Sequence, residues 1–477
     1  MTLLVASVQG HPGETMQGAD VIEFRLDLCE DGADIAAMLD ACSLPAIVTC
    51  RSREEGGLFE GDEDERISLY REALKASRPP RYIDIEYEAL LRREDLIEEL
   101  EVGECGVILS WHGPSGRPAD LLQRAERMQA IDEAAVVKLA WTARSVRDNV
   151  EAFELLQSRT KPMIAICMGS HGLLSRVLAP KFGAFATFAA ADEDHLTASG
   201  QPTVRALLDC YRIRDIDRDT RVYGVIGDPI EHSASPAYHN AAFADDGRNA
   251  VLVPMPVPAG WESCKATLLT MIDAAGLDFR GAAVTMPHKA NLVRLLRETG
   301  GNLDAASRLV GAANTLIVSD DQRSCVNTDL PAAVEVLGGD LSGHRVLLLG
   351  AGGVARSIGA GVLDAGGTVA VAARNAEQAA ALASDLGCHV AVEGEPATIV
   401  VNCTPLGMGG ETEADSDPAE ALVPWLSLVP PLIVFDTVYE PSATPLLTRA
   451  TAAGCETIPG IRLFDRQAAL QQTAWRS

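Results

Sequence analysis

Short apolar runs alternate with polar, amphipathic stretches along the first 215 residues of the chain. The runs contain β-branched residues, and stretches with helical periodicity separate most of them, as at 63–76, 120–131 and 146–157. A strand–helix unit repeated eight times predicts a (β/α)8 barrel, and the pattern leaves an open doubly wound sheet as the alternative. The eight runs lie at 3–8, 21–27, 45–50, 82–86, 105–110, 135–140, 162–167 and 184–188.

The pattern changes after the barrel. A charged stretch at 212–220 precedes a new apolar run at 222–227, and a second break lies at 337–345. We therefore expect an α/β chain in which the barrel is followed by a two-domain dehydrogenase with a Rossmann-type cofactor domain. The predicted domains are the barrel at 1–215, a substrate-binding domain at 221–335 to which a C-terminal helix at 460–477 returns, and a cofactor domain at 336–459.

The amino-acid composition disfavours several classes of function. The 477 residues are 47% hydrophobic and carry a formal net charge of −27, and both halves are acidic, which disfavours nucleic acid and anionic membranes as partners. No apolar run approaches a membrane span, and the N-terminus lacks the basic region of a signal peptide. The 11 cysteines show no CXXC pair, several lie in apolar runs, and no zinc signature appears. We therefore expect a reduced compartment, the cytoplasm, and no metal.

Candidate chemistry gathers at the carboxyl ends of the barrel strands, where barrels hold their active sites. Lys138 stands in an apolar strand, so burial is expected to lower the pKa of its amine and to allow a Schiff base with a carbonyl substrate. The alternative is a structural lysine paired with Asp84 or Glu86. His112, expected just after the fifth strand, suits acid–base work near neutral pH, or it is a satisfied loop histidine.

The motifs EFRLDL, VTCRSREEGG, IDIE, SWH, VVKLA, MGSHGLLSRVLAPKFGAFATF and TASGQ, in this order, resemble type I 3-dehydroquinate dehydratase over almost all of 1–210. The resemblance implies that Lys138 forms the imine, that His112 is the acid–base group, and that Glu55 orients the histidine. Thr197 stands where the family usually has Ser, and its hydroxyl is expected to serve. The implied substrate ligands are Glu23, Arg25, Arg51, Arg176, Thr197 and Gln201.

A second set of motifs begins at VLLLGAGGVARSIG, 346–359, where Gly350, Gly352 and Ala355 fit the G-x-G-x-x-A pattern between a strand and a helix. Glycines there let a backbone approach the pyrophosphate of a dinucleotide at a helix N-terminus. The next strand ends in Arg374 rather than in Asp or Glu, which favours a 2′-phosphate and therefore NADP(H). The alternative is a solvated surface arginine.

The segments YGVIGDPIEHSASPAYHNAAF, VTMPHK, GAANTL, VNTDL, NCTPLGM, FDTVY and DRQAAL resemble shikimate dehydrogenase over nearly all of 221–477. The resemblance implies a catalytic pair of Lys289 and Asp329, for which an ordinary ion pair is the alternative. Ala283 replaces the Asn of many relatives, so one polar substrate contact is expected to be lost or replaced. The implied substrate ligands are Ser233, Ser235, Thr285, Asn314, Tyr439 and Gln467, and the implied cofactor ligands are Gly350, Ala351, Gly352, Gly353, Ala355, Arg374, Asn375 and Thr404.

The two resemblances together imply consecutive reactions of the shikimate pathway: dehydration of 3-dehydroquinate to 3-dehydroshikimate, then NADPH-dependent reduction to shikimate. All three compounds carry a carboxylate and hydroxyls, which suits Arg-lined and Ser/Thr-lined pockets. Two alternatives remain at this point, a dehydrogenase half that prefers quinate and a non-catalytic metabolite sensor built on the same folds.

Overall fold

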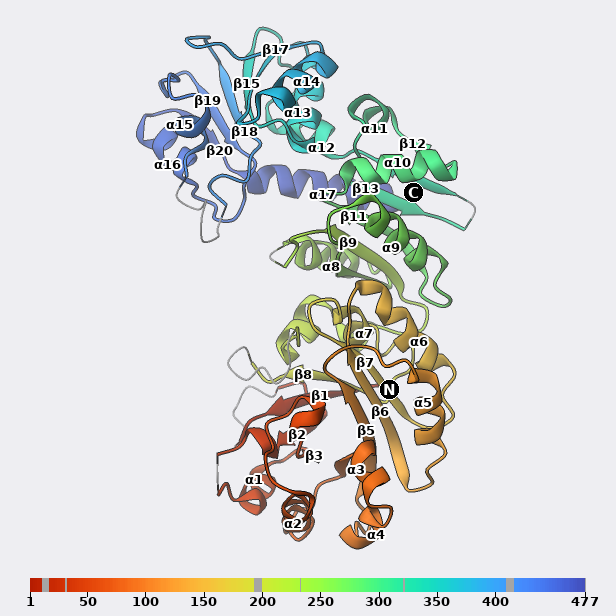
Figure 1. Ribbon diagram of the computed structural model, residues 1–477. Helices are drawn as coiled ribbons and strands as arrows, with labels where there is room; N and C mark the ends of the chain where they lie inside the picture. Colours follow the sequence, from red (N-terminus) through yellow and green to blue (C-terminus); the bar gives the residue numbers. More distant parts are fainter. Residues whose placement is uncertain are drawn as a thin grey trace. The chain divides into compact units, whose positions relative to one another are not determined.

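The computed structural model describes residues 1–10, 17–30, 32–192, 200–231, 233–320, 322–408 and 416–476. The chain forms two compact units. The first comprises Met1–Pro258 and Ala266–Phe279, and the second comprises Ala259–Lys265 and Arg280–Ser477. Figure 1 shows the ribbon, coloured along the sequence.

Eight parallel strands form the main sheet of the first unit. They are β1 (Leu3–Val8), β2 (Val21–Arg25), β3 (Ala46–Thr49), β4 (Tyr82–Glu86), β5 (Gly106–Gly113), β6 (Ala134–Thr142), β7 (Met163–Met168) and β8 (Ala186–Ala190). The order is β7-β6-β5-β4-β3-β2-β1-β8, so the first strand pairs with the last, from Leu3↔Ala186 to Ser7↔Ala190. The sheet is a nearly closed barrel, which confirms the predicted fold and excludes the open doubly wound sheet.

Helices follow most of the barrel strands and cover its outside. The longest, α2, begins with a capping box in which Asp62 and Glu65 bond reciprocally to each other's backbone N–H. The barrel helices are α1 (Ile35–Ala41), α2 (Glu63–Leu74), α3 (Tyr87–Arg92), α4 (Leu96–Leu100), α5 (Leu121–Gln129), α6 (Asn149–Gln157) and α7 (Leu173–Val177).

The charged stretch at 212–220 is bound to the barrel. The buried Lys181 donates through Nζ to the carbonyls of Arg218 and Thr220, both at 2.8 Å. Arg214 donates to Asp20 at 2.7 Å on the other side. These bonds explain why the first unit continues past the predicted boundary into β9 (Arg221–Gly227), α8 (Ser235–Asp245) and β10 (Ala250–Pro256), the two strands being parallel.

The second unit begins with a small mixed sheet. In it, β11 (Phe279–Val284), whose first residue belongs to the first unit, runs antiparallel to β13 (Thr315–Val318), which is antiparallel to β14 (Arg323–Val326). The short β12 (Asn302–Leu303) pairs in parallel with β14. The helices in this region are α9 (Trp261–Asp273), which crosses the boundary between the units, α10 (Lys289–Thr299), α11 (Ala305–Val310) and α12 (Asp329–Val336).

A six-stranded parallel sheet completes the second unit, in the order β17-β16-β15-β18-β19-β20. Hydrophobic cores cover both faces, as expected for a Rossmann-type sheet. Its strands are β15 (Arg345–Leu349), β16 (Thr368–Ala372), β17 (His389–Val390), β18 (Ile399–Asn402), β19 (Ile433–Asp436) and β20 (Glu456–Ile458). Its helices are α13 (Gly353–Asp364), α14 (Ala376–Leu386), α15 (Pro418–Leu422) and α16 (Pro445–Ala452).

The last helix, α17 (Gly460–Arg476), runs from the six-stranded sheet toward the small sheet (Figure 1). Trp475 donates to the carbonyl of Leu316 in β13 at 2.9 Å, and Gln471 donates to the carbonyl of Asn314 at 2.9 Å. The helix therefore ties the two sheets of the second unit together. None of the helices in the described ranges combines the length and the hydropathy of a membrane span.

Candidate active sites

The pleat of the barrel strands explains why polar side chains gather inside the barrel. Side chains two residues apart share a face of a strand. On β6, Lys138 therefore shares the inner face with the core residues Val136 and Ala140. On β5, Ser110 and His112 follow Ile108 in the same way. The register pairs Ser110 with Lys138, so His112 lies one inward-facing step nearer the carboxyl end.

Lys138 is only 5% exposed, and carboxylates rather than an apolar wall surround its amine. Nζ donates to Asp84 Oδ2 at 2.9 Å and lies 3.5 Å from Glu23 Oε1. The ring of Phe188 lies 4.2 Å from Nζ, a cation–π contact. The expected partner Asp84 is thus present, and Glu86 makes no ion pair with Lys138 among the described residues.

Asp84 is the centre of this cluster. Its Oδ1 accepts from Arg51 Nη2 at 2.7 Å and from Ser110 at 2.5 Å, while Oδ2 accepts from Lys138. Burial favours the neutral acid, but Arg51 and Lys138 outweigh it and hold the pKa of Asp84 well below its usual value. The carboxylate is therefore ionised and pairs with the lysine ammonium.

Glu55 and His112 form a buried dyad. Glu55 Oε2 lies 3.0 Å from His112 Nδ1 and accepts from the backbone N–H of His112 at 3.0 Å. Its Oε1 is buried without a hydrogen-bond partner among the described residues, which disfavours the ionised form. Burial raises the pKa of Glu55 to about 8, although Arg51 opposes the rise. Burial, Arg51 and Lys138 lower the pKa of His112 well below its usual value.

His112 differs from its expected place. It was predicted to follow the fifth strand, but β5 runs to Gly113, because His112 and Gly113 pair with Ala140 and Trp141 of β6. The histidine is thus held by the sheet rather than by a loop. Its ring bond to Glu55 is the contact that the dehydratase resemblance implied.

The three arginines expected to hold the substrate differ in their partners. Arg25 bonds bidentately to Asp27, at 2.8 and 2.7 Å. Arg51 donates through its two terminal nitrogens to Asp84, Glu55, Glu86 and Ser110. Arg176 is buried and donates to the carbonyl of Phe188 at 2.9 Å, but it pairs with no carboxylate among the described residues. Burial lowers the pKa of Arg176 to about 10, so it stays charged at neutral pH.

Other predicted residues of the barrel site are placed as follows. Glu23 is buried and accepts from Ser7 at 2.6 Å and from Thr49 at 2.9 Å. Gln201 is 7% exposed, and Thr197 lies outside the described residues. The sequence places Asp84 at the end of the fourth strand and as a possible partner of Lys138, but neither it nor Ser110, Ser7 or Thr49 is among the predicted site residues. The signal for Asp84 was the polar end of the strand IDIE.

In the second unit, the glycine-rich turn has the geometry of a dinucleotide site. Gly350, at φ +114, lies so close to β18 that a Cβ would come within 3.1 Å of Thr404 and Cys403. Gly352 precedes α13 and has open space where a Cβ would stand. An open glycine at a helix N-terminus leaves backbone N–H groups accessible to a phosphate. The residues fit the pyrophosphate of a dinucleotide.

Another glycine of this turn, Gly353, lies beside the predicted catalytic pair. A Cβ on Gly353 would stand 4.0 Å from Cδ of Lys289. Lys289 Nζ donates to Asp329 Oδ2 at 2.6 Å, and the two side chains are 14% and 5% exposed. The fold therefore brings together residues 40 positions apart and places them next to the cofactor turn.

Asn314 connects Asp329 to the last helix. Its Nδ2 lies 2.9 Å from Asp329 Oδ1 and 2.8 Å from Gln467 Oε1 of α17. Its Oδ1 accepts from the backbone N–H of Thr328 at 2.9 Å. Three predicted residues, Asp329, Asn314 and Gln467, thus form one hydrogen-bonded group.

The remaining predicted residues of the second unit lie around this group or at strand ends. Arg374 is exposed directly after β16, and Asn375 caps α14 by accepting from the backbone of Glu377 and Gln378. Thr404 donates to Asn402 at 2.7 Å at the end of β18. Ala351 is half-buried, Ala355 is buried in α13, and Tyr439 packs against Phe464 with ring centroids 5.2 Å apart.

Four further predicted residues lie on or just after β11 or in the first unit. Thr285 follows β11 and is half-buried, whereas Ala283 is buried in that strand and pairs with Thr315. Ser233 and Ser235 belong to the first unit, where Ser233 Oγ accepts from the backbone of Ser235 at the start of α8. Among the described residues, no group of three or more His, Cys, Asp or Glu side chains could hold a metal ion.

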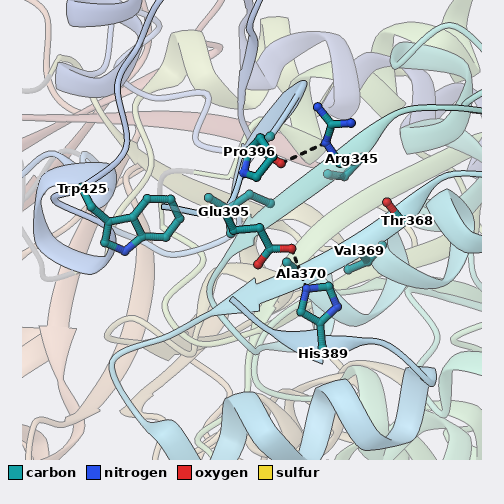
Figure 2. A pocket seen from close by; sticks show the side chains of 11 residues that line it. Arg345, Thr368, Val369, Ala370, His389, Glu395, Pro396 and Trp425 are labelled. Atoms are coloured by element: carbon teal, nitrogen blue, oxygen red, sulfur yellow. Dashed lines mark hydrogen bonds and ion pairs between the residues drawn. The ribbon is translucent and has the colours of Figure 1, made fainter. Parts of the chain in front are cut away.

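A pocket lies at the opposite, amino-terminal ends of β15 and β16 (Figure 2). Its polar side chains satisfy one another: His389 Nε2 lies 2.6 Å from Glu395 Oε1, and Arg345 donates to the carbonyl of Pro396 at 3.1 Å. Dinucleotides bind at the carboxyl ends of such strands. This pocket is therefore not the cofactor site.

Comparisons with known proteins identify relatives of both parts of the chain. The family model of type I 3-dehydroquinase matches residues 12–218, and that of the shikimate dehydrogenase substrate binding domain matches residues 225–316. The chain is 32% identical over 482 residues to the chloroplastic bifunctional 3-dehydroquinate dehydratase/shikimate dehydrogenase of Arabidopsis thaliana, covering 94% of this chain and 76% of that protein.

Two further relatives resemble the C-terminal half. The shikimate dehydrogenase (NADP(+)) of Methanocella arvoryzae is 37% identical over 267 residues, which cover 53% of this chain and 92% of that protein. The solved shikimate 5-dehydrogenase of Thermus thermophilus, in complex with NADP(H) and shikimate, is 26% identical, with 54% of this chain and 93% of that chain covered and a TM-score of 0.46.

Proposed function

The chain belongs to the bifunctional 3-dehydroquinate dehydratase/shikimate dehydrogenase family, and from that premise we propose which residues carry out its two reactions. It is an enzyme of the shikimate pathway with NADP(H) as its cofactor. The observation that supports the assignment of roles is the pair of lysines that are each held by a buried carboxylate, Lys138 by Asp84 and Lys289 by Asp329.

In the barrel, Lys138 attacks the ketone of 3-dehydroquinate. The ammonium must first lose a proton, and Asp84 Oδ2 at 2.9 Å holds Nζ in place for the attack. The amine adds to the carbonyl to give a carbinolamine, which expels one water to form an iminium, and the iminium acidifies the adjacent carbon. His112 removes that proton and returns it to the departing hydroxyl, which leaves as water. Hydrolysis of the imine consumes one water, so the net change is the loss of one water.

Arg176 is the proposed ligand of the substrate carboxylate. It is a buried cation without a carboxylate partner among the described residues, whereas Arg25 and Arg51 are already paired. A desolvated, uncompensated charge is costly, and an anionic substrate would compensate it. Glu23, Arg25, Arg51, Thr197 and Gln201 remain proposed ligands of the hydroxyl groups.

The pH dependence of dehydration should report the Glu55–His112 dyad. Neutral His112 is the base only when Glu55 is ionised and accepts the Nδ1 proton, so kcat/KM should rise with pH through about 8, the raised pKa of Glu55. Glu55→Gln should lower kcat by roughly 10²–10⁴ and abolish this rise of kcat/KM with pH, the acid limb of the profile. The measurement is the absorbance of the enone product across pH.

The control for that profile is NADPH-dependent reduction of 3-dehydroshikimate by the same preparation, since Glu55 belongs to the barrel. A Glu55→Gln variant with wild-type kcat, or with an unchanged acid limb, would contradict the assigned dyad.

For the dehydrogenase, Lys289 gives a proton to the carbinol oxygen that forms during reduction, and Asp329 holds the ammonium in place. NADPH, when bound, supplies the hydride. The proposed substrate ligands are Thr285, Asn314, Tyr439 and Gln467, together with Ser233 and Ser235. The proposed cofactor ligands are Gly350, Ala351, Gly352, Gly353, Ala355, Arg374, Asn375 and Thr404.

Arg374 should determine the preference for NADPH over NADH. Charge-assisted bonds to the 2′-phosphate contribute about 1.5–3 kcal/mol, so Arg374→Ala should weaken NADPH about ten- to a hundredfold and NADH little. Arg345→Ala is the matched control, because Arg345 lies at the other end of β15 (Figure 2). If the wild type and Arg374→Ala show the same ratio of NADPH affinity to NADH affinity, another residue binds the 2′-phosphate.

The division into functional parts is proposed as 1–215 for the dehydratase, 221–335 with 460–477 for the substrate-binding domain, and 336–459 for the cofactor domain. All 11 cysteines are free thiols, which supports a reducing compartment, the cytoplasm, although the Arabidopsis relative is chloroplastic. No observation favours quinate, and a sensor would have no need of two lysine–carboxylate pairs. A coupled assay with 3-dehydroquinate and NADPH, following the enone and NADPH oxidation, tests the whole assignment.

A further inference from the structure

Behind the Glu55–His112 dyad lies a second buried ion pair, formed by Glu86 of β4 and Arg66 of α2. Arg66 Nη1 donates to Glu86 Oε2 at 2.6 Å, and both side chains are about as buried as Lys138, at 5% and 4% exposure. Glu86 Oε1 also accepts from the backbone N–H of Ser52 at 2.8 Å. Neither Glu86 nor Arg66 takes part in the proposed dehydration steps, yet both are charged and buried.

Arg51 links this pair to the dyad. Its Nη1 lies 3.2 Å from Glu55 Oε2 and 3.4 Å from Glu86 Oε1, so one nitrogen serves two carboxylates. Its Nη2 is committed to Asp84 at 2.7 Å. Glu86 therefore influences where the guanidinium of Arg51 lies. Through that position it influences how strongly Arg51 stabilises the ionised form of Glu55.

The balance of buried charge points the same way. Three carboxylates, Glu23, Asp84 and Glu86, face three cations, Arg51, Arg66 and Lys138. Glu55 is a fourth carboxylate, and its ion-pair cation among the described residues, Arg51, also pairs with Asp84 and Glu86. Glu86 therefore competes directly with Glu55 for Arg51 Nη1.

We propose that Glu86, anchored by Arg66, is a positioning residue that acts through Arg51 to set the pH at which the Glu55–His112 dyad becomes a base. This rests on the dehydratase role proposed for that dyad. The charged groups that face Glu55 are Arg51, Asp84 and Glu86, with His112 bonded to it. Glu86 opposes ionisation of Glu55 twice, by its own negative charge and by drawing on Arg51 Nη1.

Glu86→Gln tests the proposal. Loss of the negative charge frees Arg51 Nη1 for Glu55, so the acid limb of kcat/KM for dehydration should move to lower pH by about one unit, as expected for one buried charge at short range. The matched control is Glu63→Gln, which removes the other carboxylate on Arg66, 28% exposed and without a contact to Arg51 among the described residues. Its limb should stay at the wild-type pH.

An acid limb of Glu86→Gln that stays in place or moves to higher pH would overturn the proposal. If this variant does not fold, as judged from its thermal midpoint, Arg66→Met tests the link from the other side. Loss of the positive charge should move the limb to higher pH, and an unmoved limb would again overturn the proposal. His112→Ala distinguishes failure of the dyad assignment from failure of the role of Glu86. If His112→Ala keeps wild-type dehydration, the dyad assignment itself fails. If His112→Ala is inactive but the acid limb of Glu86→Gln stays at the wild-type pH, only the role of Glu86 fails.

Discussion

Lys138→Ala is expected to abolish dehydration of 3-dehydroquinate, by at least about 10⁴-fold, because no other amine can replace the one that forms the imine. The variant should keep full NADPH-dependent reduction of 3-dehydroshikimate, since Lys289 and the glycine-rich turn belong to the second unit. Removal of the ammonium leaves Asp84 and Glu23 without their shared cation. The barrel should therefore lose stability as well, and turnover must be expressed per folded molecule.

Borohydride trapping identifies the lysine directly. An imine is reduced to a stable secondary amine, so wild-type protein treated with 3-dehydroquinate and borohydride should gain a covalent adduct, located at Lys138 by peptide mapping. Lys161→Ala is a matched control, because Lys161 also lies in the barrel but donates to the backbone carbonyls of Ile131 and Ala134. It should be labelled like the wild type. An adduct at another residue, or dehydration that survives in Lys138→Ala, would exclude the Schiff-base assignment.

The barrel could be predicted because its signal is local and repeated. Each strand is a short apolar run whose inner positions alternate, and the eight runs match the eight strands to within a few residues. The exact end of β5 could not be read in this way. His112 and Gly113 continue the strand beyond the predicted end because they pair with β6, and pairing is a non-local property.

The protein groups that bind each charged side chain could not be predicted either. Sequence reasoning placed Lys138 in apolar surroundings because its chain neighbours are Val137 and Leu139, but those point away from the barrel interior. The groups that surround Nζ come from β2 and β4. Arg51 was expected to bind substrate, and four protein groups already bind its guanidinium. Motifs name the residues of a site, whereas their partners follow only from the fold.

The first unit shows the same limit at the predicted domain boundary. The charged stretch at 212–220 has the composition of a linker, yet the barrel lysine Lys181 binds two of its carbonyls. A polar sequence predicts exposure of side chains and says nothing about backbone carbonyls that accept a buried donor. The predicted domain boundary between 215 and 221 therefore stays a prediction, and the first compact unit extends beyond it.

Lys289→Ala is expected to lower kcat for reduction of 3-dehydroshikimate by about 10²–10⁴ while NADPH binding stays near normal. The reason is that the oxygen of the reduced carbonyl needs a proton, and Nζ of Lys289, held at 2.6 Å by Asp329 beside the glycine-rich turn, is the proposed donor. If the two residues were only an ion pair, the variant would lose stability, because Asp329 is 5% exposed and would be left without its cation, but each folded molecule would turn over normally.

The double variant Lys289→Met/Asp329→Asn separates these two cases. It removes both charges, so no uncompensated carboxylate remains, and Asn at position 329 can still bond to Asn314 as Asp329 does. Its thermal midpoint should recover most of what Lys289→Ala loses. Under the catalytic assignment kcat stays low in the stable double variant, because an amide and a thioether supply no proton. If kcat recovers together with the thermal midpoint, the pair only braces the fold, and the proton for the carbinol oxygen comes from another group.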